Sequence, residues 1–307
     1  MNKTLLGAIL VLIIFSCKNE KKDNSKLNVV TTTTMITDLV KNIGDTLVNV
    51  QGLMGSGVDP HLYKASEGDV TKLYNADIIF YNGLHLEGKL VEVFEKMKNK
   101  KTVAISSVLD KNTLIGSDYF ASNYDPHIWF DIDYWKQVTN YVVKTLSEAI
   151  PEKRKNFQTN GFRYLRQLED LNKRVKVTIE TLPKDQRILV TAHDAFNYFG
   201  KAFGFEVVGL QGLSTATEAG VQDVQKLATF IIEKNVKAIF VESSVPKRTI
   251  EALQAAVTSK GHEVTIGGTL YSDALGDAET IEGTYIGMFE HNVNTIVEAL
   301  KTPPNLP

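Results

Sequence analysis

The stretch from Pro151 to Leu182 most constrains the fold, because it repeats apolar or small residues in steps of three and four. The repeat consists of Phe157, Gly161, Tyr164, Leu168, Leu171, Val175, Ile179 and Leu182. This spacing predicts a helix that buries one side. Pro151 suits a first helical turn, and Pro183 ends the pattern. At about 1.5 Å per residue, such a helix spans roughly 48 Å, so we expect it to join two lobes.

Strand-like and helical patterns alternate on both sides of this helix. Before it, we predict strands at 27–33, 47–53, 76–81 and 102–106, with helices at 35–43, 67–75, 88–98 and 132–149. After it, we predict strands at 187–191, 206–210, 237–241 and 263–267, with helices at 195–203, 221–235, 247–259 and 285–300. The expected fold is α/β, with two lobes that each hold a small parallel sheet flanked by helices. One long rigid helix joins the lobes.

The start of the chain predicts export. Residues 5–15 form an apolar run that follows Lys3 and is too short to span a bilayer stably. It ends in Ser16-Cys17, and Cys17 is the single cysteine of the chain. This arrangement resembles the lipobox of bacterial lipoproteins, whose cysteine is lipidated, and the alternative is an ordinary signal peptide with a chance cysteine. We expect a signal peptide over 1–16, a flexible tether over 17–26, an N-terminal lobe over 27–147, a connecting helix over 148–183 and a C-terminal lobe over 184–307.

Charge and cysteine content exclude some classes of function. The net charge of −2 and the pI near 6.3 leave no basic surface of the kind that binds nucleic acid. The single cysteine allows no intramolecular disulfide, and lipidation would leave no thiolate to bind a metal.

The tripeptide Asp-Pro-His occurs twice, ending at His61 and at His127. Each proline restrains the loop that aims the imidazole, which suits a metal ligand, whereas a simple turn is the structural alternative. His193 and Asp273 each follow a predicted strand, where ligands of parallel sheets gather. The histidines His85, His262 and His291 lack such a setting, and we assign none of them to a metal.

Eight segments, in order, resemble one family. They are the lipobox, GVDPHLYKAS, YNGLHLEG, DPHIWFD, TAHDAFNYFG, QGLSTATEAG, FVESSV and LYSDALG. Together they resemble the substrate-binding lipoproteins of zinc and manganese ABC importers, in particular the TroA-type branch. The resemblance covers essentially the whole chain after residue 16. It implies two α/β lobes fixed to one long helix, with a metal buried between them.

The resemblance also implies the site and its use. The metal ligands would be His61, His127, His193 and Asp273, and the cargo would be one Zn²⁺ or Mn²⁺ ion. Three imidazoles and one carboxylate suit Zn²⁺, and they hold Mn²⁺ if the carboxylate is bidentate. Manganese relatives typically have Glu at the position of His193, and zinc relatives typically carry a histidine-rich loop that is absent from 110–123. Both Zn²⁺ and Mn²⁺ therefore remain candidates for the cargo.

We accordingly expect a monomeric extracytoplasmic protein, periplasmic or at the cell surface, that is not an enzyme. It would be anchored to the bilayer through Cys17 and would deliver its ion to an importer permease. Two other classes remain as alternatives. A zinc hydrolase would use three protein ligands and a general base, for which Glu218 and Glu242 are candidates, although such loop carboxylates are more often solvated or placed behind the ligands. A surface adhesin with a structural metal would have no permease partner.

Overall fold

The computed structural model describes residues 26–97, 101–117 and 120–301. Its first half builds one parallel sheet in the order β2-β1-β3-β4. The elements of this half are β1 (Leu27–Thr31), α1 (Thr34–Gly44), β2 (Val48–Gly52), α2 (Glu67–Asn75), β3 (Ile78–Tyr81), α3 (Val91–Lys96), β4 (Lys101–Ala104) and α4 (Ile132–Ala149). The helix expected over 88–98 instead begins with a 3₁₀ turn at Gly88–Leu90 and ends at Lys96.

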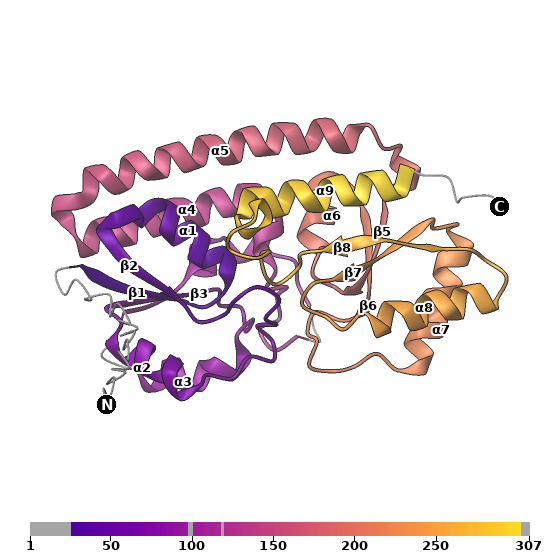
Figure 1. The fold of residues 1–307 in the computed structure, drawn as a ribbon, viewed down its shortest axis with the longest axis horizontal. Coiled ribbons are helices and arrows are strands. Elements are labelled where there is room, and N and C mark those ends of the chain that lie inside the picture. Colours follow the sequence, from indigo (N-terminus) through magenta and orange to yellow (C-terminus); the bar gives the residue numbers. More distant parts are fainter. Residues whose placement is uncertain (1–25, 98–100, 118–119, 302–307) are drawn as a thin grey trace, which may run out of the picture.

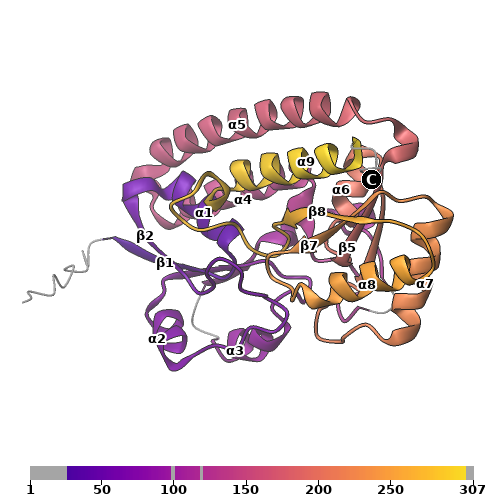
Figure 2. The ribbon, with the colours of Figure 1, turned by 45° about the vertical axis from the view of Figure 1, so that its right-hand side comes forward.

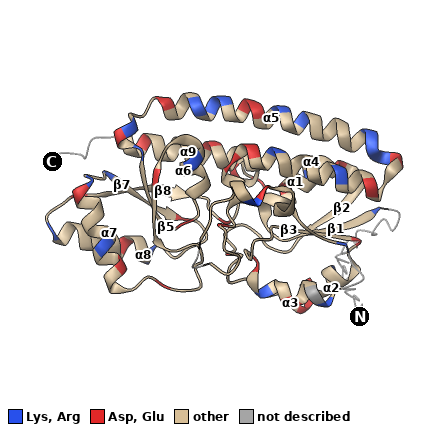
Figure 3. Cartoon of the chain, turned by 180° about the vertical axis from the view of Figure 1, so that it is seen from behind, with Lys and Arg blue, Asp and Glu red and all other residues tan. Residues whose placement is uncertain are grey.

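The predicted connecting helix is α5 (Arg154–Glu180), a continuous helix of 27 residues. Pro151–Lys153 form a 3₁₀ turn before it, so the α-helix itself begins three residues later than predicted. Every member of the predicted apolar stripe is buried, from Phe157 to Leu182. The opposite side carries Lys, Arg, Asp and Glu along its length (Figure 3). This amphipathic pattern lets α5 run along one side of both halves (Figure 1).

The second half repeats the alternation of strands and helices, as predicted. Its elements are β5 (Ile188–His193), α6 (Asn197–Phe203), β6 (Glu206–Gln211), α7 (Val221–Glu233), β7 (Ala238–Glu242), α8 (Arg248–Ser259), β8 (Thr265–Leu270) and α9 (Tyr285–Lys301). The strands form two parallel pairs, β5-β6 and β7-β8. The register of the β7-β8 pair shifts between Ile239 and Val241. The helix expected from Ala195 begins at Asn197.

The main hydrophobic core is shared by the two halves. One cluster of buried residues includes side chains of α1, α4, α5, α6 and α9. The indole of Trp135 in α4 stacks on Tyr285 at the start of α9, with ring centroids 5.0 Å apart. Phe130, just before α4, stacks on Phe196 at 4.4 Å. Figures 1 and 2 both show α9 lying alongside α5, so the last helix of the chain helps to bind the halves together.

Within the described ranges, the structure contains no helix with both the length and the apolarity needed to cross a membrane.

Candidate metal centre

Four side chains from distant parts of the sequence meet between the halves. His61 lies in the loop that follows β2, and His127 comes directly before the 3₁₀ turn Ile128–Phe130. His193 is the last residue of β5, and Asp273 follows β8. One potential ligand atom from each residue lies within 4.8 Å of all the others. The structure thus brings together the four residues that the sequence singled out.

The distances within this group suit a single shared ion. The Nε2 atoms of His61 and His127 are 3.3 Å apart. Oxygens of Asp273 lie 3.2 Å from His193 Nε2, 3.5 Å from His127 Nε2 and 4.0 Å from His61 Nε2. Ligands that bind a metal at about 2.0–2.2 Å are separated by distances of this order. All four side chains are buried, and His61, which is 5% exposed, is the most accessible of them.

Both Asp-Pro-His segments fold into the same local turn. The carboxylate of Asp59 accepts a hydrogen bond from the backbone N–H of His61 at 2.8 Å, and Asp125 does the same for His127 at 2.9 Å. An aspartate that binds the backbone two residues further on forms an Asx turn. Local chemistry therefore explains why this tripeptide presents a histidine at both places.

Two buried carboxylates orient two of the imidazoles. Asp125 Oδ1 lies 2.7 Å from His127 Nδ1. Glu242 Oε2 lies 2.6 Å from His193 Nδ1, while its Oε1 accepts the backbone N–H of His193 at 2.8 Å. A carboxylate at Nδ1 keeps the proton there and leaves Nε2 free to bind a metal.

Both carboxylates lie behind candidate ligands. For Glu242 this agrees with the sequence-based interpretation of a carboxylate placed behind the ligands rather than a general base, although it is the last residue of β7 and not a loop residue, and is 2% exposed. Asp125 was noted only as part of a turn. The sequence signal that could have identified Asp125 is the acidic residue two positions before the histidine in each Asp-Pro-His tripeptide. No local pattern pointed from His193 to Glu242, which is 49 residues away.

The electrostatics of the group favour a bound cation. Burial lowers the pKa of His61 to about 3, so this imidazole offers a free lone pair at neutral pH. Although burial alone would raise the pKa of Asp273, the charge of His193 holds it well below its usual range. Burial would lower the pKa of His193, but the carboxylates of Glu242 and Asp273 raise it well above its usual value. A divalent ion would replace the proton that these carboxylates hold on His193.

Several atoms of the group have no hydrogen-bond partner among the described residues. They are both ring nitrogens of His193, although Nδ1 lies 2.6 Å from Glu242 Oε2, and both carboxylate oxygens of Asp273, and all are buried. Buried polar atoms without a partner are costly unless an ion or water satisfies them. Three imidazole nitrogens and a carboxylate match the donors preferred by Zn²⁺, and a bidentate carboxylate would also accommodate Mn²⁺.

Hydrogen bonds join the halves directly around the candidate site. Thr215 in the second half donates to Asp59 Oδ2 at 2.5 Å, and Trp129 Nε1 donates to the carbonyl of Ser272 at 2.9 Å. Asn197 Nδ2 donates to Asp125 Oδ2 at 3.1 Å. Residues within two positions of His61, His127 and Asp273 are thus fixed across the interface.

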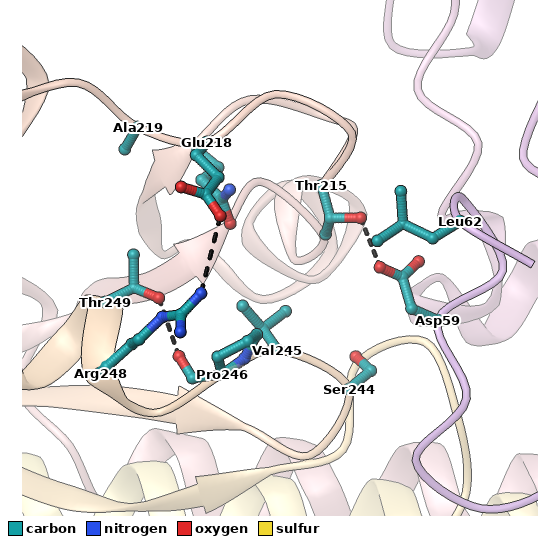
Figure 4. Close-up of a pocket in the computed structure, with 11 residues that line it drawn as sticks. Asp59, Leu62, Thr215, Glu218, Ala219, Ser244, Val245, Pro246, Arg248 and Thr249 are labelled. Atoms are coloured by element: carbon teal, nitrogen blue, oxygen red, sulfur yellow. Dashed lines mark hydrogen bonds and ion pairs between the residues drawn. The ribbon is translucent and has the colours of Figure 1, made fainter.

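A pocket of about 310 Å³ opens beside this interface. Figure 4 shows Asp59 and Leu62 on one side, facing Thr215, Ser244 and residues of the second half. Glu218, proposed from the sequence as a possible general base, lines this pocket, is exposed, and lies 3.7 Å from Arg248. It is not a member of the buried group.

The remaining histidines and Cys17 are placed as follows. His262 follows Gly261 and lies 3.4 Å from the carbonyl of Val236, and His291 lies within α9, 3.0 Å from the carbonyl of Thr269. His85 is exposed, and none of the three belongs to the buried group. Cys17, the predicted lipidation site, lies outside the described residues.

Comparison with known proteins gives one consistent relationship. Residues 29–299 match the model of a family described as zinc-uptake complex component A, periplasmic. The chain is 49% identical to the zinc-binding protein TroA of Treponema pallidum over 93% of this chain and 92% of that protein. It is 45% identical to the manganese-binding lipoprotein MntA of Bacillus subtilis, over 98% and 100% of the two chains. The solved structure of the Treponema pallidum protein superposes with a TM-score of 0.88, covering 90% of this chain and all of the other.

Proposed function

This chain belongs to the family of periplasmic zinc-uptake A components, and we propose that it carries one Zn²⁺ or Mn²⁺ ion as cargo to the permease of an ABC importer. The observation that carries this proposal is the buried group of His61, His127, His193 and Asp273. Relatives named for zinc and for manganese are similarly close, so the comparison leaves both ions as candidates.

In this proposal the four side chains are the metal ligands, two from each half. Residues 27–147 and 184–307 act as the lobes, and residues 148–183 connect them. The shared core and α5 restrict the lobes to a small relative movement. Binding of the ion would draw the ligand pairs together and change the surface that the permease meets.

The donor set favours binding and transport over catalysis. Four protein ligands complete a tetrahedral shell, whereas catalytic zinc sites keep one position for water. The carboxylates next to the site also contact histidines rather than facing an open position. We therefore assign the chain a binding role.

We further propose that the protein acts as a monomer outside the cytoplasm, attached to the membrane by a lipid on Cys17. The relative MntA is named a lipoprotein, which supports this proposal. Residues 17–26 would then serve as the tether between the lipid and the first lobe.

Elemental analysis of the purified protein tests the proposed cargo, with one equivalent of zinc or manganese as the expected result. His61→Ala and Asp273→Ala should each weaken binding by at least about tenfold, because an incomplete shell holds the ion poorly. His262→Ala is the matched control and should bind as the wild type does. Unchanged affinity in either ligand variant, measured by competitive titration, would contradict the shared site.

A further inference from the structure

The turn that carries His85 has an unusual backbone. Gly83, Leu84 and His85 have φ angles of 83°, 51° and 61°, so three consecutive residues are left-handed. Glycine adopts this conformation freely, but leucine and histidine do so at a cost. Residues held in sparsely populated conformations often occur where function needs them, provided the surroundings fix them.

The surroundings of this turn fix it firmly. The buried carboxylate of Glu87 accepts the backbone N–H of Asn82 at 2.7 Å and the hydroxyl of Thr32 at 2.6 Å. The side chain of Asn82 donates to the carbonyl of Pro126 at 2.9 Å. Pro126 directly precedes His127, so the turn is tied to a loop that supplies a candidate ligand.

The same turn places His85 against a ring that also contacts one of the candidate ligands. Phe120 lies edge-on to both imidazoles, with ring centroids 6.3 Å from His85 and 6.4 Å from His61. His61 is the most accessible of the four candidate ligands, so an ion arriving from solvent meets its side of the group first.

The ring of His85 also has room because its neighbour is a glycine. A Cβ atom on Gly88 would lie 2.8 Å from His85 Nε2, closer than such contacts allow. His85 is otherwise exposed to solvent. The imidazole therefore packs over Gly88 and remains reachable by a hydrated ion.

We propose that His85 is an additional metal-binding residue that takes up a divalent transition ion at the surface and passes it to His61. This proposal rests on the function proposed above and concerns the way in which the ion reaches the buried group. Imidazole binds these ions readily, and it can replace one water of the hydrated ion before the remaining waters are lost. His85 would then bind the ion only during its passage and would not be a ligand of the final complex.

The pocket in Figure 4 is an alternative route by which an ion could reach the buried group. It is lined by Asp59 from the loop of His61, and its exposed carboxylate is Glu218. An ion that entered there would meet Glu218 and not His85. The two routes therefore predict different sensitive residues.

Stopped-flow binding of Zn²⁺ to the metal-free protein tests the proposal, with the fluorescence of Trp129 as signal, since its ring lies 5.3 Å from that of His127. His85→Asn removes the imidazole while keeping a residue that tolerates the left-handed conformation. We expect its association and dissociation rate constants to fall together by about tenfold, within the range over which rates vary among variants of one binding site. The affinity should stay unchanged, because His85 does not bind the ion in the final complex.

His85→Gly should give the same slowing with a more relaxed backbone, which separates the loss of the imidazole from a folding defect. His262→Asn and Glu218→Gln should keep the wild-type rates. The proposal is overturned if His85→Asn associates at the wild-type rate, if Glu218→Gln is the variant that slows, or if His85→Asn weakens affinity with unchanged association. Failure of the wild type to bind Zn²⁺ or Mn²⁺ in a prior titration would instead overturn the proposed function itself.

Discussion

At the scale of single residues, Asp125 and Glu242 decide which nitrogen of each oriented histidine faces the candidate site. Both carboxylates contact Nδ1 and also accept the backbone N–H of the same histidine. Each imidazole is therefore held at two points by one side chain. His61 differs, because Asp59 accepts its backbone N–H and reaches across to Thr215.

Glu242→Gln should weaken metal binding by about 10- to 100-fold, as loss of such orienting partners typically does. An amide has one acceptor and one donor group, so it cannot accept both N–H groups of His193 as the carboxylate does. If its NH₂ faces Nδ1, the proton of His193 moves to Nε2 and blocks the ligand atom. Competitive titration measures the effect, and the exposed Glu263→Gln is the control. Wild-type affinity in Glu242→Gln would show that the contact with Glu242 does not orient the ligand.

At the scale of helices, the contact between α4 and α5 depends on a glycine. A Cβ atom at Gly161 would lie 2.4 Å from a γ-methyl of Val143, and a β-branched side chain in a helix has little freedom to move aside. Gly161 therefore permits the close approach of the two helices. This explains why a residue with poor helix propensity stands in the middle of α5.

Gly161→Ala should destabilise the protein by about 1–2 kcal/mol, because overpacking outweighs the gain of about 1 kcal/mol in helix propensity. Gly68→Ala in α2 is the matched control, since its Cβ would make only an ordinary contact at 3.6 Å. That control should be neutral or stabilising. Urea unfolding measures the stability of both variants. The double variant Gly161→Ala/Val143→Ala should lose less free energy of unfolding than the sum of the losses in the two single variants. A stabilised Gly161→Ala would contradict the close-packing explanation.

The carboxyl group of Asp38 is buried at the junction of α1 and α9, and burial disfavours its charged form. Burial raises the pKa of Asp38 from 3.8 to about 6, although the backbone N–H of Tyr285 and the amide of Asn42 donate to its oxygens. Between these two pH values the folded state holds a proton that the unfolded state has lost. The contribution of Asp38 to stability therefore falls as pH rises from about 4 to about 6.

Asp38→Asn should consequently be more stable than the wild type at pH 7, by up to about 3 kcal/mol. The difference should shrink as pH falls below 6 and vanish below about pH 3, where the wild-type carboxyl is protonated in both the folded and the unfolded state. Urea unfolding across this pH range measures the difference, with the exposed Asp185→Asn as control. A difference that does not depend on pH would show that Asp38 does not titrate in this window.

At the scale of the whole molecule, the two halves are not independent units of stability. The core cluster extends from β1 to α9, and the stacked pair Trp135–Tyr285 joins α4 to the last helix. Hydrogen bonds such as that from Trp129 to Ser272 add further links at the candidate site. Separation of the halves would expose this common core.

We therefore predict one cooperative thermal transition for the protein without metal, with coincident circular dichroism and tryptophan fluorescence curves. Zn²⁺ should shift the whole transition upward, by about 4 kcal/mol of stability at a free concentration of 1,000 times the dissociation constant. Differential scanning calorimetry at several metal concentrations measures both effects. Two resolved transitions, or a shift of only part of the curve, would contradict a shared core.

Features that depend on neighbouring residues could be predicted from the sequence. The apolar stripe of α5, the order of strands and helices and the turn made by each Asp-Pro-His segment follow from local spacing and local hydrogen bonds. The four candidate ligands were also named from the sequence: strand ends and restrained histidines made them candidates, and the family resemblance implied the set. Helix starts were less accurate, since capping and 3₁₀ turns shifted them by two or three residues.

Only the tertiary structure decided which distant groups act on these elements. It placed Glu242 against His193 and Thr215 against Asp59, although these pairs are 49 and 156 residues apart. It also carried α9 across to the first half, so that the two predicted lobes share one core. Such contacts depend on how the faces of helices and strands pack together. Hydrophobic periodicity shows which face of an element is buried, but it does not show which other element that face packs against. The sequence by itself therefore determined the elements and the chemistry of the candidate ligands, while packing determined their orientation and their burial.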